Sequence, residues 1–353
     1  MSLAMLFGVV LPGIGLIGGH KAALGPPPTF TVTLTSVAAA DIAFDASRRV
    51  IYASVQGSNS IAIVKQKTGA VVGTIATPVA PGLLAVSDDD TKLYFATSSG
   101  FDRIDLATQT VDQTYTFAGT VGAPAPSPTA LTIAPGHSNL VAAGFINQFG
   151  TPQPVFGVTL VDNGVAQGTV VIGQGFPSVA GLTFDGTAAN LYVENSLGNV
   201  LDYTVGLAPL GLTLANQISG VSPVGPLSEK KGKLCAGGQV LTESPLAFVG
   251  QFDVAGSRWF VAPKPNVQKA YGVEFGSTPT AVPNFSILST HTYATLATWP
   301  LDGLPTSPIP GDVVTVTKLI FSGPHRAALV TTDLFTNAKT LVLLNIPDSD
   351  DAP

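Results

Sequence analysis

Four histidines and a few clustered acids are the side chains of this sequence best suited to catalysis or metal binding. Asp88-Asp89-Asp90 could hold a hard cation, but consecutive acids are also common in an exposed tight turn. No two histidines have the spacing of metal ligands or of a base beside a nucleophile; they are His20, His137, His291 and His325. Gly-x-Ser-x-Gly, Walker and dinucleotide-binding glycine patterns are absent. We therefore assign no catalytic, cofactor-binding or metal-binding residue, and expect no cofactor.

The elements that would position a site repeat along the chain. A polar or basic residue followed at once by a short apolar stretch occurs seven times. The apolar stretches begin at Val50, Leu93, Leu140, Leu191, Leu234, Ala270 and Ala327. They recur every 36 to 57 residues, about 46 on average. A period of roughly 40 to 50 residues made of short strands is typical of propeller blades. The pattern predicts an all-β fold, a seven-bladed β-propeller of four-stranded antiparallel blades.

The last repeat lacks an outer strand, because the chain ends nine residues after Leu344. Thr29–Thr35, upstream of the first repeat, alternates polar and apolar residues as a half-buried strand does. We predict that this N-terminal strand completes the last blade and so closes the ring. The expected organisation is an apolar N-terminal segment at 1–28, the propeller at 29–345 and an acidic C-terminal tail at 346–353.

The clearest copy of the repeat is Leu191-Tyr192-Val193-Glu194-Asn195, which follows Phe184-Asp185-Gly186. A third strand that continues into Asp105–Val111 has the same character. These residues resemble the YVTN-type repeats of bacterial seven-bladed propellers, and the resemblance covers about nine tenths of the chain. It implies a fold but no particular chemistry, because the group includes surface proteins, binding proteins and a few lactonases and lyases.

In a propeller, the connections from second to third strands and from blade to blade gather at one face of the ring. These are the long connections of this sequence: 119–128, 144–156, 217–226, 276–284 and 300–312. Binding sites tend to lie on such loops above a rigid scaffold. We therefore expect any site to lie on that face.

A metal site resembling that of gluconolactonase-like propellers would need several oxygen ligands at the starts of the innermost strands. Asp41 is the single carboxylate at those positions, which makes such a site improbable. Glu194, Glu274 and Asp333 follow second strands. They could form an acidic rim for a cationic or sugar ligand, but separate exposed carboxylates are the favoured interpretation.

Composition narrows the class of partner. Charged residues make up only 11 % of the chain, and 16 Lys and Arg against 22 Asp and Glu give a net charge of −6. This acidic balance argues against nucleic acid. Cys235 is the single cysteine, so no intrachain disulfide forms, and we expect it to be a core residue. Trp259 and Trp299 could stack on a sugar, but packing between blades or at the outer edge is favoured.

Residues 3–19 are apolar and carry no charged side chain. They could be a secretory signal, a retained membrane anchor or a segment that packs against the protein. An export-related origin is favoured. We therefore expect a periplasmic, cell-surface or extracellular protein, with membrane association through residues 3–19 as an alternative.

These observations favour a non-enzymatic propeller that binds a protein partner or forms a subunit of a larger assembly. Contact would be made through the long-loop face or the apolar N-terminus. One alternative is a lactonase-like or lyase-like enzyme with its site at the channel mouth. Another is a stalk or matrix protein that associates with itself.

Overall fold

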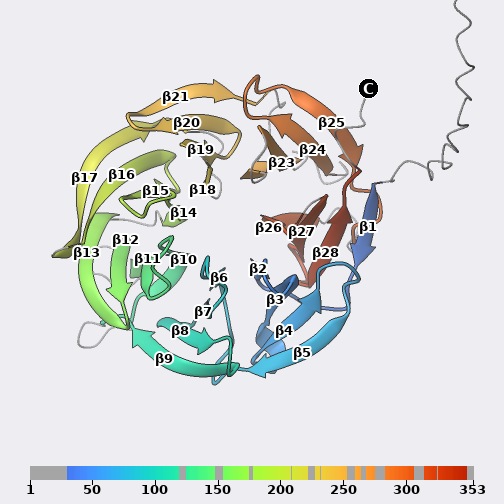
Figure 1. Cartoon of the computed structure of the whole chain (residues 1–353), viewed down its shortest axis with the longest axis horizontal. Helices are drawn as coiled ribbons and strands as arrows, with labels where there is room; N and C mark the ends of the chain where they lie inside the picture. Colours follow the sequence, from blue (N-terminus) through green and yellow to red (C-terminus); the bar gives the residue numbers. More distant parts are fainter. Residues whose placement is uncertain are drawn as a thin grey trace, which may run out of the picture.

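Seven small sheets stand around a common axis like the blades of a propeller (Figure 1). Each sheet in this computed structural model has four antiparallel strands. One 3₁₀ turn, Gln56–Ser58, is the only helical element among the described residues. The predicted all-β, seven-bladed propeller is confirmed. The structure describes residues 30–118, 125–147, 154–174, 178–207, 209–221, 227–230, 232–252, 259–263, 268–274, 283–305, 314–323 and 325–347.

The strands of blades 1 to 4 follow one another in chain order from the axis outward. Blade 1 contains β2 (Ile42–Asp45), β3 (Val50–Val55), β4 (Ser60–Lys65) and β5 (Val71–Ala76). Blade 2 contains β6 (Leu84–Val86), β7 (Lys92–Ala96), β8 (Gly100–Asp105) and β9 (Thr110–Thr116). Blade 3 contains β10 (Ser127–Ile133), β11 (Leu140–Asn147), β12 (Val155–Asp162) and β13 (Val165–Gln174). Blade 4 contains β14 (Val179–Phe184), β15 (Asn190–Asn195), β16 (Asn199–Leu207) and β17 (Leu210–Ser219).

Blades 5 and 6 have the same order, and blade 7 takes its outer strand from the other end of the chain. Blade 5 contains β18 (Leu227–Lys230), β19 (Lys233–Ala236), β20 (Gln239–Glu243) and β21 (Leu246–Gln251). Blade 6 contains β22 (Trp259–Pro263), β23 (Lys269–Glu274), β24 (Asn284–Ser289) and β25 (Thr295–Pro300). Blade 7 contains β26 (Val314–Phe321), β27 (Arg326–Asp333), β28 (Lys339–Asn345) and β1 (Thr31–Leu34).

The N-terminal strand closes the ring as predicted. Strand β1 pairs antiparallel with β28, with Thr31 opposite Asn345 and Leu34 opposite Val342. Just before β1, Phe30 stacks on Trp299 of blade 6 with ring centroids 5.4 Å apart and planes 8° apart. The first residues of the propeller therefore join its last two blades, and Trp299 packs between blades at the outer edge, as expected.

A β-bulge recurs between the third and fourth strands of the first six blades. The register shifts at Ile63/Val64 in blade 1 and at equivalent places in blades 2 to 6. A bulge increases the local right-handed twist of a sheet, which suits the twisted shape of a blade. The pair β28 and β1 has no such shift, and it is also the one pair whose strands are not joined by a turn.

In several blades, a buried tyrosine of the second strand packs against the next blade. Tyr52, Tyr94, Tyr192 and Tyr271 are among the largest fully buried side chains of the described residues. Tyr52 lies in a cluster with Leu84 and Leu93 of blade 2, and Tyr192 lies with Leu234 of blade 5. The core is therefore a set of layers between neighbouring blades, and burial of these rings fixes their spacing.

The outer strand of blade 6 starts later than the pattern of Tyr293-Ala294-Thr295-Leu296 predicts, and the innermost strand of blade 5 includes one of the two apolar residues that the sequence offers for it. The outer strand of blade 6 begins at Thr295 and not at Tyr293, because Tyr293 adopts a left-handed φ of 61° in the preceding turn. The innermost strand of blade 5, for which the sequence offers only Val224 and Leu227, begins at Leu227.

The N-terminal segment 1–28 and the charged end of the tail lie outside the described residues. The same holds for residues 119–124, 148–153, 222–226, 276–282 and 306–312 of the long connections. Within the described part of the chain, no helix is long and apolar enough to cross a membrane.

Candidate functional site

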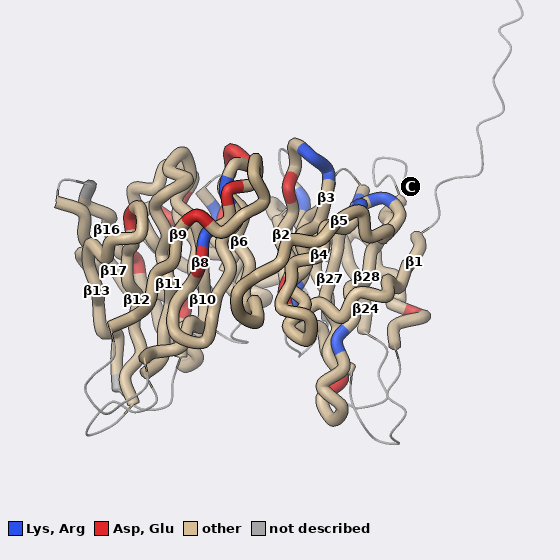
Figure 2. Tube along the Cα trace, turned by 90° about the horizontal axis from the view of Figure 1, so that it is seen from below, with Lys and Arg blue, Asp and Glu red and all other residues tan. Residues whose placement is uncertain are grey.

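The two faces of the ring differ in the connections they carry. Turns between first and second strands, and between third and fourth strands, lie on one face, which we call the turn face. Connections between second and third strands, and between blades, lie on the opposite face, which we call the loop face. Figure 2 shows the ring from the side with the turn face at the top.

Asp41, the single carboxylate at the start of an innermost strand, joins three blades. Its side chain is buried, and its Oδ2 accepts a hydrogen bond from the backbone N–H of Leu84 in blade 2 at 2.7 Å. Its Oδ1 lies 3.3 Å from the Nζ of Lys318 in blade 7. The carboxylate is therefore already bonded to its neighbours, which gives it a structural role around the axis.

Two of the three acids that follow second strands, Glu194 and Asp333, are buried. Glu194 is fully buried (0 % exposed), and Asp333 is 7 % exposed. The Oδ1 of Asp333 accepts hydrogen bonds from the backbone N–H groups of Phe335 and Thr336 and so caps the turn after β27. The expectation of separate exposed carboxylates is wrong for these two residues, and neither stands on an acidic rim. The side chain of Glu274 lies outside the described residues, as does that of Trp259.

The polar residues of the clearest repeat accept hydrogen bonds from backbone groups of its turns. The Oδ1 of Asp185 accepts hydrogen bonds from the N–H groups of Thr187 and Ala189 in the turn between β14 and β15. The Oδ1 of Asn195 accepts hydrogen bonds from the N–H groups of Leu197 and Asn199 in the next turn. The motif is therefore explained by folding, since its polar residues satisfy backbone donors at both ends of β15.

The triple aspartate fastens blade 2 to both neighbours on the turn face. Asp90 Oδ2 accepts a hydrogen bond from the Ser47 N–H of blade 1 at 2.9 Å. Asp88 Oδ2 accepts one from the Gly136 N–H of blade 3 at 2.8 Å. Asp89 accepts bonds from Ser87 and Thr91 within the turn. The three carboxylates are engaged with backbone and hydroxyl donors, as acids of a tight turn commonly are.

Four acids approach one another at the seam between blades 4 and 5. Burial and the neighbouring Glu229, with which it shares a side-chain hydrogen bond, raise the pKa of Glu243 to about 8. Asp185 and Asp202 of blade 4 act on Glu243 in the same direction. Burial also raises the pKa of Asp202, whose Oδ1 is buried and makes no hydrogen bond among the described residues. This cluster places like charges in a region of low dielectric constant.

None of these groups forms a metal site. Within the described ranges, no three His, Cys, Asp or Glu side chains are placed to hold a metal ion. His137 and His325 lie in the turns before β11 and β27, in blades 3 and 7, and His291 lies in the turn before β25. His20 is outside the described residues.

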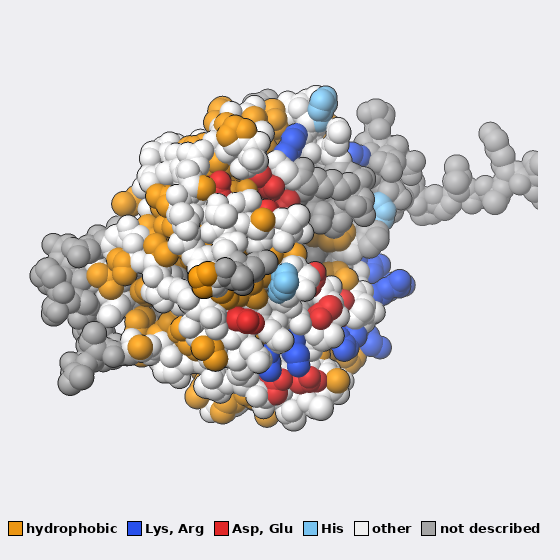
Figure 3. All heavy atoms as spheres, turned by 60° about the vertical axis from the view of Figure 1, so that its left-hand side comes forward, with side chains coloured by type: hydrophobic (Ala, Val, Ile, Leu, Met, Phe, Trp, Pro, Cys, Tyr) orange, Lys and Arg blue, Asp and Glu red, His pale blue; other side chains and the backbone are white. Residues whose placement is uncertain are grey.

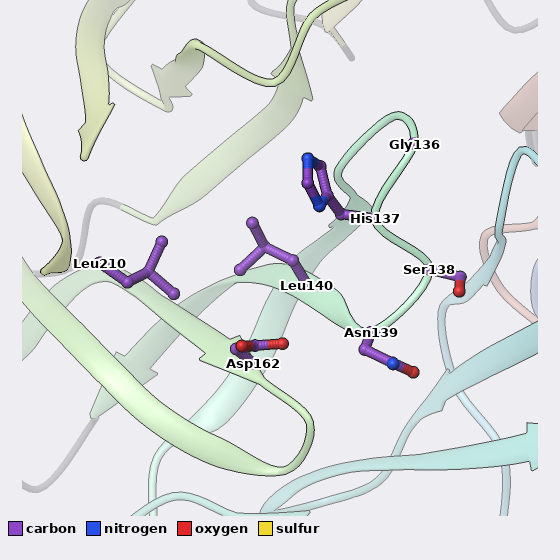
Figure 4. Close-up of a pocket in the computed structure, with 7 residues that line it drawn as sticks. All are labelled: Gly136, His137, Ser138, Asn139, Leu140, Asp162 and Leu210. Atoms are coloured by element: carbon purple, nitrogen blue, oxygen red, sulfur yellow. The ribbon is translucent and has the colours of Figure 1, made fainter. Parts of the chain in front are cut away.

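A pocket of about 420 Å³ opens on the turn face between blades 3 and 4 (Figure 4). It is lined by Gly136, His137, Ser138, Asn139, Leu140, Asp162 and Leu210. The first four form the turn before β11, Asp162 ends β12, and Leu210 begins β17. Its volume lies in the range of pockets that accept a small ligand or an anchoring side chain.

The pocket wall is held by bonds to blade 2. The Arg103 guanidinium pairs with Asp112 at 2.8 and 3.0 Å, and its Nη1 donates to Asn139 Oδ1 at 2.8 Å. The hydroxyl of Tyr94 donates to the Ser138 carbonyl at 2.9 Å. Together with the bond from Gly136 to Asp88, these contacts fix the turn that carries His137.

The outer strands beside the pocket carry no charge. Strands β13, β17 and β21 form the outer edge of blades 3, 4 and 5 and contain no Asp, Glu, Lys or Arg. Five apolar side chains on them are between 39 % and 60 % exposed: Val165, Val171, Leu214, Phe248 and Val249. We call these three strands the outer rim of blades 3 to 5. Figure 3 brings this side forward, and the left part of the face shows hydrophobic and uncharged polar side chains.

Two features make this rim continuous with the pocket. Blades 3 and 4 approach closely at Gly168 and Gly211, where a Cβ built on Gly168 would lie 3.4 Å from the Cα of Gly211. Leu210, which lines the pocket, is the first residue of β17.

The sequence of these blades is also free of basic residues. It has no Lys or Arg between Arg103 and Lys230, a stretch that includes all of blades 3 and 4. This surface was not predicted from the sequence, although the absence of Lys and Arg between Arg103 and Lys230 is a signal for it.

No protein-family model matches the chain, and no curated protein matches its sequence. Among solved structures, the chain is similar to the β-propeller domain of Cps50 (Swd1) from Myceliophteria thermophila, with a TM-score of 0.63 and 12 % sequence identity. The match covers 90 % of this chain and 100 % of that domain. At this identity the similarity shows the fold alone. The protein is thus a seven-bladed β-propeller.

Proposed function

We propose that this chain is a non-enzymatic, exported or surface-associated β-propeller that binds a protein partner or forms a subunit of a larger assembly. The observation that carries the proposal is the uncharged outer rim of blades 3 to 5, with its exposed apolar side chains and the adjoining pocket. The engagement of Asp41, Asp88 and Asp333 in structural hydrogen bonds supports a scaffold role.

The rim has the properties of a protein contact. Depletion of charge distinguishes the core of protein interfaces, because desolvation of charged groups opposes association. The exposed apolar side chains of the rim, among them Leu214 and Phe248, would be removed from water on binding, and this burial would contribute favourable free energy to the complex. The pocket beside them offers a place for one anchoring side chain, as binding hot spots lie in such pockets.

The proposal is tested by the size of the native assembly. We would compare the tagged wild-type chain, recovered from its source by gentle lysis, with a Leu214→Lys, Phe248→Lys variant. A matched control, Val71→Lys with Val72→Lys, changes two similarly exposed residues on β5 of blade 1. We expect the wild type and the control to migrate as a complex and the rim variant as the monomer. An assembly of unchanged size in the rim variant would overturn the proposed surface.

Export is supported by the uncharged apolar residues 3–19 and by the low overall charge. We propose a location in the periplasm, at the cell surface or outside the cell. Fractionation of the source cells, with determination of the mature N-terminus, tests it. Recovery of the chain from the cytoplasm with Met1 intact would contradict it.

We also propose that the blades are repeats of the YVTN type. The structural roles of Tyr192 and Asn195 support this, because they explain why both residues recur in such a motif. Replacement of Asn195 by Ala should then destabilise blade 4, and Asp333→Ala at the equivalent turn should destabilise blade 7 to a similar degree. If both variants were as stable as the wild type, the shared role of Asn195 and Asp333 in their turns would be contradicted.

A further inference from the structure

The Lys and Arg side chains of the described residues fall into two groups. Most are engaged in ion pairs or hydrogen bonds, as Arg48 is with Asp45, Lys92 with Asp105 and Lys318 with Asp41. Arg49, Lys65, Lys67 and Arg326 make neither an ion pair nor a hydrogen bond through their side chains within the described ranges. These four cations belong to blades 1 and 7, which are neighbours in the closed ring.

Three of the four lie on adjacent turns of blade 1. Arg49 precedes β3, and Val50 is paired directly with Lys65 at the end of β4, which places Lys65 with Val50 on the side of blade 1 that packs on blade 2. Lys67 follows in the turn between β4 and β5, and Arg49, Lys65 and Lys67 are all exposed. Figure 2 shows basic segments beside the labels of β3 and β5 at the turn face.

The fourth cation reaches the same place because blades 1 and 7 are packed together there. Gln66, between Lys65 and Lys67, is 7 % exposed and is inserted against Gly323 of the turn before β27. A Cβ built on Gly323 would lie 2.4 Å from the Gln66 Nε2, so the two turns touch. Arg326 ends that turn, whose backbone is closed by a hydrogen bond from the Arg326 N–H to the Gly323 carbonyl. We call Arg49, Lys65, Lys67 and Arg326 the basic seam patch.

We propose that the basic seam patch binds a carboxylate-rich segment of a protein. This rests on the proposed function as a protein-binding propeller, but it uses a different surface from the outer rim. The patch gathers four positive charges on a molecule whose net charge is −6. Guanidinium and ammonium groups bind carboxylates through charge-assisted hydrogen bonds, and none of these four is already neutralised by a described acid.

The surroundings of the patch favour a short acidic segment over a long polyanion. Asp88, Asp89 and Asp90 lie on the same face in blade 2, and Asp45 and Asp90 surround Arg48 at the edge of the patch. A nucleic acid or an anionic membrane would extend over these acids and be repelled, whereas a few Asp or Glu residues would fit within the seam.

The chain itself includes one such segment in its sequence. Asp348, Asp350 and Asp351 follow Ile346, whose N–H donates to the His325 carbonyl beside Arg326 at 2.8 Å. We take a partner protein as the source of the carboxylate-rich segment, and one arm of the experiment tests whether the chain's own tail competes with it.

The test is a titration of the full chain with a labelled decapeptide of glutamates, followed by fluorescence anisotropy at low ionic strength. We expect saturable binding that weakens as salt is raised. A variant with Arg49→Gln and Lys67→Gln should bind at least about threefold more weakly, since the loss of each exposed ion pair costs a factor of roughly 1.5 to 5. The control is Lys339→Gln, which removes one charge from blade 7 at the loop face. It should bind like the wild type.

Two further arms identify the source and the class of ligand. A variant with Asp348→Asn, Asp350→Asn and Asp351→Asn should bind the peptide with the affinity of the wild type. Tighter binding would show that the chain's own tail competes for the patch, and it would overturn a partner as the ligand. Phosphatidylserine vesicles and a single-stranded oligonucleotide serve as other anions.

Three other results would overturn the proposal: no peptide binding at low salt, equal weakening by Lys339→Gln, or tighter binding of vesicles or oligonucleotide than of the peptide. Melting temperatures equal to that of the wild type would show that the patch variants fold. The outer-rim variant should keep its peptide affinity, so this proposal and the proposed rim can fail separately.

Discussion

Polar residues at the seams between blades join neighbouring sheets. Arg103 bonds to Asp112 in its own blade and to Asn139 in the next, and Asp41 bonds to Leu84 and Lys318 on either side. These contacts are made by charged side chains, which are also the residue types that catalytic sites use. Their burial and partners, which depend on the neighbouring blade, distinguish a structural acid from a catalytic one.

The raised pKa of Glu243 predicts that the stability of the folded protein depends on pH. Because its pKa in the folded state is raised from 4.5 to about 8, the folded chain binds more protons than the unfolded chain between these values. Stability should be greatest near pH 5 and should fall as the pH rises toward 8 and above. The facing groups are Glu229 in blade 5 and Asp185, Asp202 and Tyr192 in blade 4.

Glu243→Gln should flatten this dependence. Glu243 is only half-buried, so we expect the loss in the wild type between pH 5 and pH 9 to be about 1–2 kcal/mol after solvent screening. Thermal unfolding at the two pH values measures it. Asp162→Asn, which removes an exposed acid, should keep the slope of the wild type. Identical slopes for Glu243→Gln and the wild type would refute the assignment.

Cys235 should be unreactive in the native protein. It is 2 % exposed, and burial raises the pKa of its thiol to about 12. Almost no thiolate is then present at pH 8, and no reagent reaches the sulfur. Alkylation with iodoacetamide followed by mass measurement should give no adduct in native buffer and one adduct in denaturant. Rapid native labelling would show that the sulfur is accessible.

Among the elements, β1 is the one that closes the ring, by pairing with β28 of the last blade. The alternation in Thr29–Thr35 and the missing outer strand of the last repeat were enough to predict its pairing with β28. The sequence could not place Phe30 against Trp299, because residues so far apart meet only after the ring closes. Tyr293 likewise looks like a strand residue, yet its backbone belongs to a turn.

Phe30→Ala should weaken the closure. The ring of Phe30 stacks on Trp299 and lies 5.5 Å from that of Phe285, so its removal loses apolar burial and aromatic contact. We expect a loss of about 2–3 kcal/mol in the free energy of unfolding. Denaturant unfolding followed by tryptophan fluorescence measures it. Leu34→Ala, at a β1 residue that is 46 % exposed, should cost less than about 0.5 kcal/mol. Equal losses would contradict a specific role for Phe30.

For the whole molecule, repetition predicts the ring but not its surface. The intervals between repeats indicated seven blades, because each blade must contain the same four short strands to pack on its neighbours. The pocket, the outer rim and the basic seam patch each combine residues from different blades or turns. Their composition is visible in the sequence, as in the absence of Lys and Arg between Arg103 and Lys230, but their proximity is not.

At this scale, the outer rim of blades 3 to 5 is the surface that we propose to contact a protein partner. The most direct test places a photo-cross-linking amino acid at Leu214 of β17, and separately at Val72 of β5, in the cells that make the protein. We predict that position 214 gives one discrete adduct with a protein, that Phe248→Lys abolishes it, and that position 72 gives none. No adduct at position 214, or the same adducts at both positions, would contradict the account.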